Sequence, residues 1–272
     1  MKRTALLCGV VFIASVAAAA PQSPKEPAAI PDLSSPDFGW EVSSGLNFLP
    51  APGKLAPIRR TAFARGGEQM GDADNANLTP WAAERMRAFG DVVRSGHRAF
   101  SAQSRCWPGG VPGQLIFQAN PIYFIQKPSE VLIIWERDHF VRRVHLNREH
   151  TPDVKPSWFG ESVGHYENGE LVVDTIGLAE HEYSFVDARD IPHTKDMHVV
   201  ERFKIVDGGN TLEATFTVDD PGAFKAPWSG LVRFEKVNRP IEEYACAENN
   251  LGYEQFFDLP EYPMPTAFRP DF

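Results

Sequence analysis

The chain has 272 residues, of which 43% are hydrophobic and 11% aromatic, enough for one large all-β domain or two small ones. Its 23 prolines and 21 glycines are many for a helical protein and ordinary for a loop-rich β protein. A formal net charge of -9, with no basic run along the chain, excludes the electrostatic footprint of a nucleic-acid-binding protein.

Residues 1–19 have the pattern of a secretory signal peptide. Lys2 and Arg3 form a basic start, residues 5–16 form an apolar stretch, and residues 17–20 are all alanine. The apolar stretch is too short for a good membrane anchor, so we expect an exported protein, periplasmic or secreted, without stable membrane insertion. Residues 20–77 predict an irregular leader and wrapping segment, because proline and glycine interrupt the pattern there.

Two cysteines, Cys106 and Cys246, remain once the signal peptide is removed. In an oxidising compartment two cysteines most simply form one disulfide, here closing a loop of about 140 residues. Two unpaired buried thiols are the alternative. The chain has no C-x-x-C motif, so we expect neither a redox nor a zinc role for these cysteines.

Residues 78–94 predict a helix that packs on a β domain. Thr79 is a natural N-cap, Pro80 suits the first helical position, and the apolar side chains that follow recur at helical spacing. The short strand-like runs after this helix are separated by turn signals, of which Asn168-Gly169 is the strongest. The runs are residues 115–118, 122–126, 130–136, 140–146, 162–167, 171–175, 197–206, 211–218, 231–237 and 242–246.

These runs predict an all-β fold over residues 78–250, an antiparallel meander of about ten strands closed as a lipocalin-like barrel. A strongly bent open sheet is the alternative. The tail, residues 251–272, is rich in aromatic residues and proline, and we expect it to pack on the barrel.

Several motifs of this region occur together in other proteins. They are residues 78–80, 106–112, 162–167, 171–175, 192–193, 198–203, 219–221 and 227–228. With this combination, residues 78 to about 250 resemble a family of uncharacterised exported bacterial proteins. The resemblance implies an exported β-rich fold and no mechanism. Family members commonly carry Trp at the position of Tyr166 and Tyr at that of His145, so ligand specificity is expected to differ if these positions face a ligand.

Ionisable side chains on otherwise apolar strand faces are the main clue to function. They are Glu136, Arg142, Asp174, Glu201 and Arg233. A closed barrel of eight to ten strands can hold one small ligand, so these groups are expected to line its interior. Buried ion pairs such as Glu136–Arg142 or Glu201–Arg233 are one alternative. A one-residue shift in register, which would place all the charges in solvent, is the other.

Histidines are the second set of candidate functional residues. A neutral imidazole beside Glu136, Glu201 or Asp174 would make an acid/base pair near pH 7. His193 precedes a predicted strand and His198 lies within it, so both are expected to serve such chemistry with Glu201 and Glu136. Predicted ligand contacts are Arg142, Arg233, Asp174, His145, His165, Tyr166 and Trp158, the last as a stacking surface for a sugar or an aromatic ring. His97, His139, His150 and His181 are assigned to surface or satisfied core positions.

Other chemistries are weakly supported by the pattern. The chain has no H-E-x-x-H motif or compact ligand spacing, so neither a metal nor another cofactor is predicted. Residues 160–164 are one residue away from a nucleophile elbow and lead into a hairpin instead. The sequence therefore predicts an exported β-barrel that binds a small organic molecule, with acid/base turnover of the lyase, isomerase or hydratase type as its enzymatic form. A non-catalytic periplasmic carrier and a structural envelope protein with a salt-bridged core are the alternatives, and oligomeric state stays open.

Overall fold

The computed structural model describes residues 30–34, 37–44, 48–56, 58, 60–63, 69–95, 102, 106–116, 120–180, 184–187 and 191–249. The predicted signal peptide and C-terminal tail lie outside these residues. The strands are β1 (Gly39–Val42), β2 (Leu49–Pro50), β3 (Arg60–Phe63), β4 (Gln69–Gly71), β5 (Ile122–Gln126), β6 (Glu130–Trp135), β7 (Val141–Leu146), β8 (Glu161–Glu167), β9 (Glu170–Ile176), β10 (His198–Val206), β11 (Thr211–Asp219) and β12 (Trp228–Val237). The helices are α1 (Pro80–Arg94) and α2 (Cys246–Asn249), and the 3-10 turns are η2 (Gly113–Ile116), η3 (Arg137–His139) and η4 (Asp207–Gly209).

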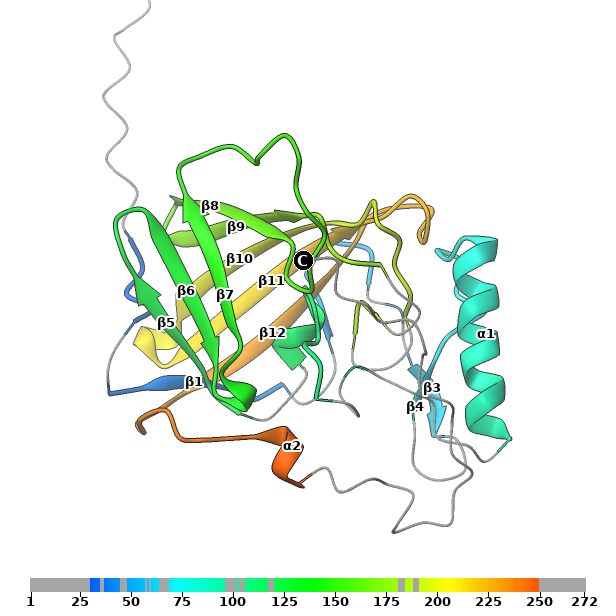
Figure 1. Ribbon diagram of the computed structural model, residues 1–272, viewed down its shortest axis with the longest axis horizontal. Helices are drawn as coiled ribbons and strands as arrows, with labels where there is room; N and C mark the ends of the chain where they lie inside the picture. Colours follow the sequence, from blue (N-terminus) through cyan, green and yellow to red (C-terminus); the bar gives the residue numbers. More distant parts are fainter. Residues whose placement is uncertain are drawn as a thin grey trace, which may run out of the picture.

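The main sheet closes into a barrel of nine strands (Figure 1). From β5 to β12 each strand pairs with the next along the chain, and β1 closes the ring by pairing with both β12 and β5. β2 lies outside the ring, beside β12, and β3 and β4 form a separate hairpin. The predicted all-β barrel is therefore confirmed.

One junction of the barrel differs from the predicted antiparallel meander. β7 and β8 run parallel, through the pairs Val144–Ser162, His145–Val163 and Leu146–Gly164. Parallel neighbours cannot be joined by a tight hairpin, so the chain returns through a crossover, residues 147–160, along the outside of the barrel. The prediction was wrong here because the alternation of apolar residues reveals a strand but not the direction of its neighbour.

Two predicted strands are replaced by other structure. Residues 115–116 of the first run belong to the 3-10 turn η2, whose four residues are all buried, and residues 117–118 lie outside the described residues. Residues 242–245 of the last run belong to an extended arm, residues 238–245, and residue 246 is the first residue of α2. The short strands β1 and β2 were not predicted, because runs of four and two residues carry too little alternation.

The barrel interior is filled by large side chains. Along β10 and β11, buried and partly exposed residues alternate in the period of two expected when one face of a sheet forms the core. Aromatic rings from β5, β10, β11 and β12 pack against one another in the edge-to-face pairs Phe124–Phe203 and Phe216–Trp228. The largest fully buried side chains are Trp40, Trp228, Phe203, Phe216 and Phe234.

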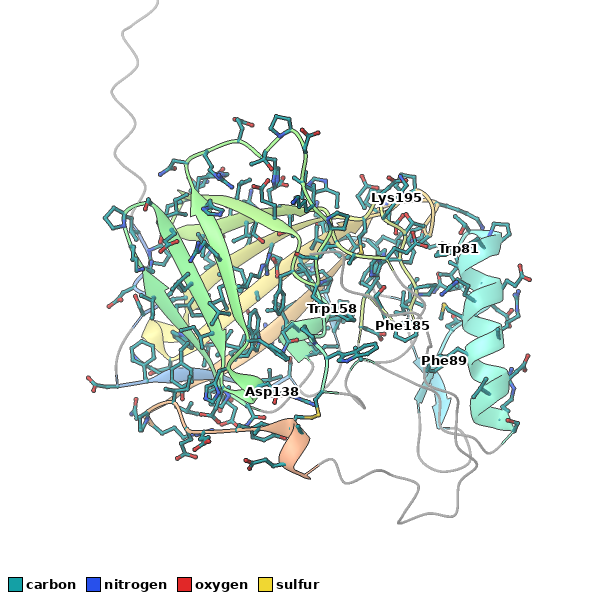
Figure 2. The ribbon with its side chains drawn as sticks, viewed as in Figure 1. Trp81, Phe89, Asp138, Trp158, Phe185 and Lys195 are labelled. Carbon is teal, nitrogen blue, oxygen red and sulfur yellow. A yellow bond between two sulfur atoms is a disulfide. The ribbon has the colours of Figure 1, made fainter. Side chains whose placement is uncertain are left out.

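Helix α1 begins as the sequence predicts. The Thr79 hydroxyl accepts a hydrogen bond from the Ala82 amide at 3.3 Å, which caps the helix, and donates one to the Gly222 carbonyl at 2.8 Å. The buried face of the helix joins the core at one end of the barrel, and Phe89 lies edge-on to Phe185, with ring centroids 5.4 Å apart (Figure 2). Among the described residues, no helix is long and apolar enough to cross a membrane.

The extended arm is fastened where β6 turns into β7. Cys246 forms the predicted disulfide with Cys106, across Cα atoms 5.6 Å apart. The backbone adds two hydrogen bonds at η3, from the Asp138 amide to the Tyr244 carbonyl at 3.0 Å and from the Cys246 amide to the Asp138 carboxylate at 2.7 Å. The arm and the loop that contains Cys106 are thus held against the same end of the barrel.

Replacing Cys106 and Cys246 together by alanine is expected to lower the free energy of unfolding by about 2–5 kcal/mol, because the unfolded chain regains the freedom that the cross-link removes. Urea denaturation followed by tryptophan fluorescence measures this change. Reduction of the wild-type protein is the control and should produce the same loss. Equal stability of the oxidised, reduced and double-alanine proteins would show that the cross-link does not stabilise the fold.

Candidate functional site

An ion pair lies in the barrel interior, between Arg142 of β7 and Glu201 of β10. Arg142 donates to the Glu201 carboxylate at 2.5 Å, to the Thr175 hydroxyl at 2.7 Å and to the Ser162 hydroxyl at 2.9 Å. Arg142 is 2% exposed and Glu201 is completely buried. Both residues face inward, as the sequence predicts, but Glu201 pairs with Arg142 and not with Arg233.

The residues Arg142, Glu201, Thr175 and Ser162, here called the interior cluster, are polar but are shielded from solvent. Oε1 of Glu201 lacks a hydrogen-bond partner among the described residues, as do the indole nitrogens of Trp135 and Trp228. Unpartnered buried polar atoms raise the free energy of the folded state, so the cluster stabilises the fold less than its count of hydrogen bonds suggests. Since no side chain of the ion pair reaches the surface, a substrate cannot reach Glu201 while the barrel stays closed.

Two of the predicted interior groups point outward. Nε of Arg233 lies 2.9 Å from the Glu213 carboxylate on the outer face of the barrel, and 52% of the Arg233 side chain is exposed. Asp174 also faces outward, because its neighbour Thr175 is the residue that reaches the interior cluster. Apolar residues occupy both faces of β9 and β12 near these positions, so the sequence pattern could not distinguish inside from outside.

Glu136 is buried at the end of β6, where it anchors the extended arm. Its two carboxylate oxygens accept hydrogen bonds from the Arg239 guanidinium at 2.9 and 3.0 Å, and the Glu242 amide donates to it at 3.1 Å. Burial alone would raise the pKa of Glu136, but these hydrogen bonds and that from Asn120 outweigh burial and lower it. Burial, with Glu136 beside it, raises the pKa of the Tyr123 hydroxyl to about 12. Because all its contacts are with the arm and its neighbours, this carboxylate anchors the arm and is not available as a general acid or base.

A second cluster, here called the outer cluster, consists of His150, Glu161, Asp174 and His198. Nε2 of His150 and Nε2 of His198 each lie 2.9 Å from the same carboxylate oxygen of Asp174. Nδ1 of His150 lies 3.2 Å from Glu161. These residues come from the crossover and from β8, β9 and β10.

The hydrogen bonds of the outer cluster shift its titration. The hydrogen bond with Asp174 raises the pKa of His198, and the same contact is the main reason that the pKa of Asp174 is lowered. The sequence pattern predicted functional roles for Asp174 and His198, whereas His150 was assigned to a surface or satisfied core position. Only the three-dimensional structure brings His150 to the cluster, because the crossover that carries it has no regular sequence pattern.

The remaining predicted contacts are dispersed: His165 and His145 lie on the outer face of the barrel, whereas Tyr166 is partly buried and packs against the core. His165 is half-exposed and lies 3.3 Å from Glu167, and Tyr166 accepts a hydrogen bond from Gln126 at 2.7 Å. His145 is half-buried on the outer face of β7, where burial and the cations Arg148 and Arg143 lower its pKa. The structure does not bring these three residues together.

A hollow opens at the end of the barrel where β8, β10 and β12 begin. Its polar lining is Ser184, Asp187 and His193, and its apolar lining includes Trp158, Leu178 and Met197. With the opening counted, the space is about 370 Å³. Its enclosed part has room for about one water molecule, so the hollow admits the end of a ligand and not a whole large one. In the view of Figure 2, Phe185 lies between Trp158 of the crossover and Phe89 of α1.

His193 is the titratable predicted residue that the structure places in this hollow. It is 5% exposed, and its Nδ1 lies 3.0 Å from the Thr194 carbonyl oxygen. Because a carbonyl only accepts hydrogen bonds, the ring proton belongs on Nδ1, and Nε2 keeps its lone pair. Burial lowers the pKa of His193 against the opposing influence of Asp220 and Glu180, so the imidazole is neutral near pH 7.

Contacts beside His193 hold the walls of the hollow in position. The Thr194 amide and hydroxyl both donate to the Asp220 carboxylate, at 2.6 and 2.7 Å, which ties the loop before β10 to the turn after β11. On the opposite wall, Gly160 has a φ of +58°, and a Cβ there would collide with the Ile176 carbonyl. Glycine therefore lets the crossover approach β9 closely and bring Trp158 to the hollow.

Within the described residues, no group of three or more His, Cys, Asp or Glu side chains is arranged to hold a metal ion. No family model, curated protein or solved structure matches this chain.

The interior cluster can be tested by replacing its ion pair with methionine. Arg142→Met or Glu201→Met alone is expected to cost about 3–5 kcal/mol of unfolding free energy, because each leaves an uncompensated buried charge. The double variant should cost less than the sum of the two, which a double-mutant cycle by urea denaturation measures. As a control, Arg233→Met, which removes an exposed pair, should change stability by less than about 1 kcal/mol. Additive losses would contradict a coupled pair.

Proposed function

We propose that this protein binds a small organic molecule at the hollow, with His193 as the group that accepts a proton or a hydrogen bond from it. The observation that carries the proposal is the neutral, buried imidazole of His193 in a hollow that also has an apolar wall. Binding sites commonly combine a mostly apolar lining with a few placed polar groups. The interior of the barrel is filled, so the ligand is placed at the mouth and not in the centre.

The wall formed by Trp158 suits a flat ligand. Trp158 lies against Trp107, with ring centroids 5.8 Å apart, and both rings are partly exposed. Indole faces of this kind bind aromatic rings and the apolar faces of sugars. Met197 and Leu178, both nearly fully buried, extend the apolar surface toward the barrel core.

The catalytic form of the proposal uses His193 as a general base. A neutral imidazole whose Nδ1–H is held by a carbonyl keeps a fixed orientation, and the lone pair on Nε2 can take a proton from a bound C–H or O–H group. Asp187 and Ser184 line the same hollow and are nearly fully buried, so they place polar atoms beside His193. In the carrier form, the same groups fix the ligand's orientation without turnover.

Export is part of the proposal. The signal peptide pattern of residues 1–19 supports it, as does the disulfide, which is typical of oxidising compartments. The disulfide also holds the loop of residues 106–113, which supplies Gly109 and Gly110 to the hollow. A rigid loop at the site would limit the entropy lost when a ligand binds.

A structural envelope protein is the second candidate. It is favoured by the enclosed Arg142–Glu201 pair and by an interior filled with aromatic rings. In this case the hollow is a packing irregularity between loops and binds nothing specifically.

A thermal-shift screen of small aromatic and sugar-like compounds tests binding. A ligand at about 100 times its dissociation constant adds about 2.7 kcal/mol to the stability of the native state, enough to raise Tm measurably. Compounds that stabilise the wild type are expected to lose this effect with His193→Gln, which removes the imidazole, and with Trp158→Ala, which removes the stacking face.

The matched control is His165→Gln, which alters a histidine on the barrel exterior and should respond to ligands as the wild type does. Replacing the O–H or N–H hydrogen of a stabilising compound with a methyl group should also abolish its stabilisation of the protein. His193 would then have no hydrogen-bond donor to accept from. Compounds that stabilise His193→Gln equally well would place binding elsewhere. A wild-type protein that no compound stabilises would leave the structural candidate standing.

A further inference from the structure

The outer cluster fastens the crossover to the barrel. His150 lies in the crossover, Glu161 begins β8 and Asp174 lies in β9, so the two contacts of His150 bridge three segments. The amide of Thr151 donates to Glu161 at 2.8 Å, which adds a backbone contact beside them. The proposed ligand-binding function does not use this cluster.

The geometry at His150 depends on how many protons its ring carries. Its two nitrogens face carboxylate oxygens, which accept hydrogen bonds but cannot donate them once ionised. Both contacts are therefore hydrogen bonds only when both nitrogens carry protons, that is, in the imidazolium form. In the neutral form a ring lone pair faces a carboxylate oxygen, and that contact becomes repulsive.

The charges around the cluster balance only when both histidines are protonated. Arg148 donates to the Glu161 carboxylate at 2.6 Å from the crossover, and Asp219 of β11 interacts electrostatically with His198. His145 of β7, with its lowered pKa, also faces Glu161. When both rings carry two protons, the three cations Arg148, His150 and His198 face three carboxylates, those of Glu161, Asp174 and Asp219. When the histidines lose their protons, Arg148 alone faces them.

The crossover also forms a wall of the hollow. Ser157, close to its end, exchanges backbone hydrogen bonds with the segment after β9, from its amide to the Gly177 carbonyl at 3.1 Å and from the Ala179 amide to its carbonyl at 2.9 Å. Trp158 follows directly and lines the hollow. The same crossover thus carries His150, which the two carboxylates contact, and Trp158, which lines the hollow.

We propose that the outer cluster is a proton-operated latch. Doubly protonated His150 bridges Glu161 and Asp174 and holds the crossover against β8 and β9. Loss of its proton breaks one of the two bonds and loosens the crossover, and with it the wall that carries Trp158.

The direction of the pH effect follows from the neighbouring groups. His198 gains a partner on folding and its pKa is raised, so its contribution is complete below its unfolded pKa of about 6.5 and is lost as pH rises through the folded value. The pKa of Asp174 is lowered, so its contribution is present above about 3.8 and is lost as pH falls through the folded value. The latch is tightest between these limits.

Amide hydrogen exchange of the full-length protein, corrected for intrinsic rates, tests the latch at about pH 5.5 and about pH 8. Protection of the amides of Thr151, Ser157 and Ala179 is expected to fall by about ten-fold or more at the higher pH, while amides in the centre of β10 and β11 keep theirs. His150→Gln, which cannot become a cation, should show low protection of the crossover at both pH values. His165→Gln should behave as the wild type.

Three results would overturn the latch. The first is crossover protection in the wild type that does not change with pH, a result that remains decisive if His150→Gln fails to fold. The second is the same pH response in His150→Gln. The third is stoichiometric Zn²⁺ raising the Tm of the wild type but not of His150→Gln, which would make the outer cluster a metal site instead.

Discussion

The buried guanidinium of Arg142 reinforces a weakly paired junction of the barrel, the one between β7 and β8. The parallel junction between β7 and β8 has three matched residue pairs, whereas β10 and β11 share nine. Arg142 extends from β7 to hydroxyls on β8 and β9 and to the carboxylate on β10. A buried cation must be compensated, so the barrel forms correctly only when all four strands are in register. Arg142 thus couples a weak junction to the strongest part of the sheet.

The same strand segments serve both faces of the wall. Thr175 and Glu201 point inward to Arg142, while Asp174 and His198 point outward to His150. Since side chains alternate with period two, the inward residues of a strand contact the buried ion pair, and the outward residues of the same strand belong to the outer cluster. The register of the strands that the interior cluster joins therefore also determines the positions of the outer cluster and the hollow.

Much of the fold could be predicted from local patterns, and the site only in part. The helix over residues 80–94 and the hairpin at Asn168-Gly169 follow from caps and turn residues that act over a few positions. Glu201 and Arg142 were placed inward correctly, because their strands alternate cleanly. Arg233 and Asp174 were misplaced where both faces of a strand are apolar. The partnership of Arg142 with Glu201, and the position of His150, depend on contacts between residues far apart in sequence, which periodicity does not encode.

The disulfide encloses every barrel strand except β1 in one covalent ring, residues 106–246. A single cut in the backbone anywhere inside this ring leaves one molecule, held by the cross-link. A cut between residues 43 and 105 has a different result, because the piece that contains β1 is then held by noncovalent contacts alone. Among these contacts are its pairing with β5 and β12 and the hydrogen bonds from the Leu33 and Ser34 amides to Gln126. β1, which closes the barrel, is therefore the one barrel strand that a single backbone cut detaches from the rest of the covalent chain.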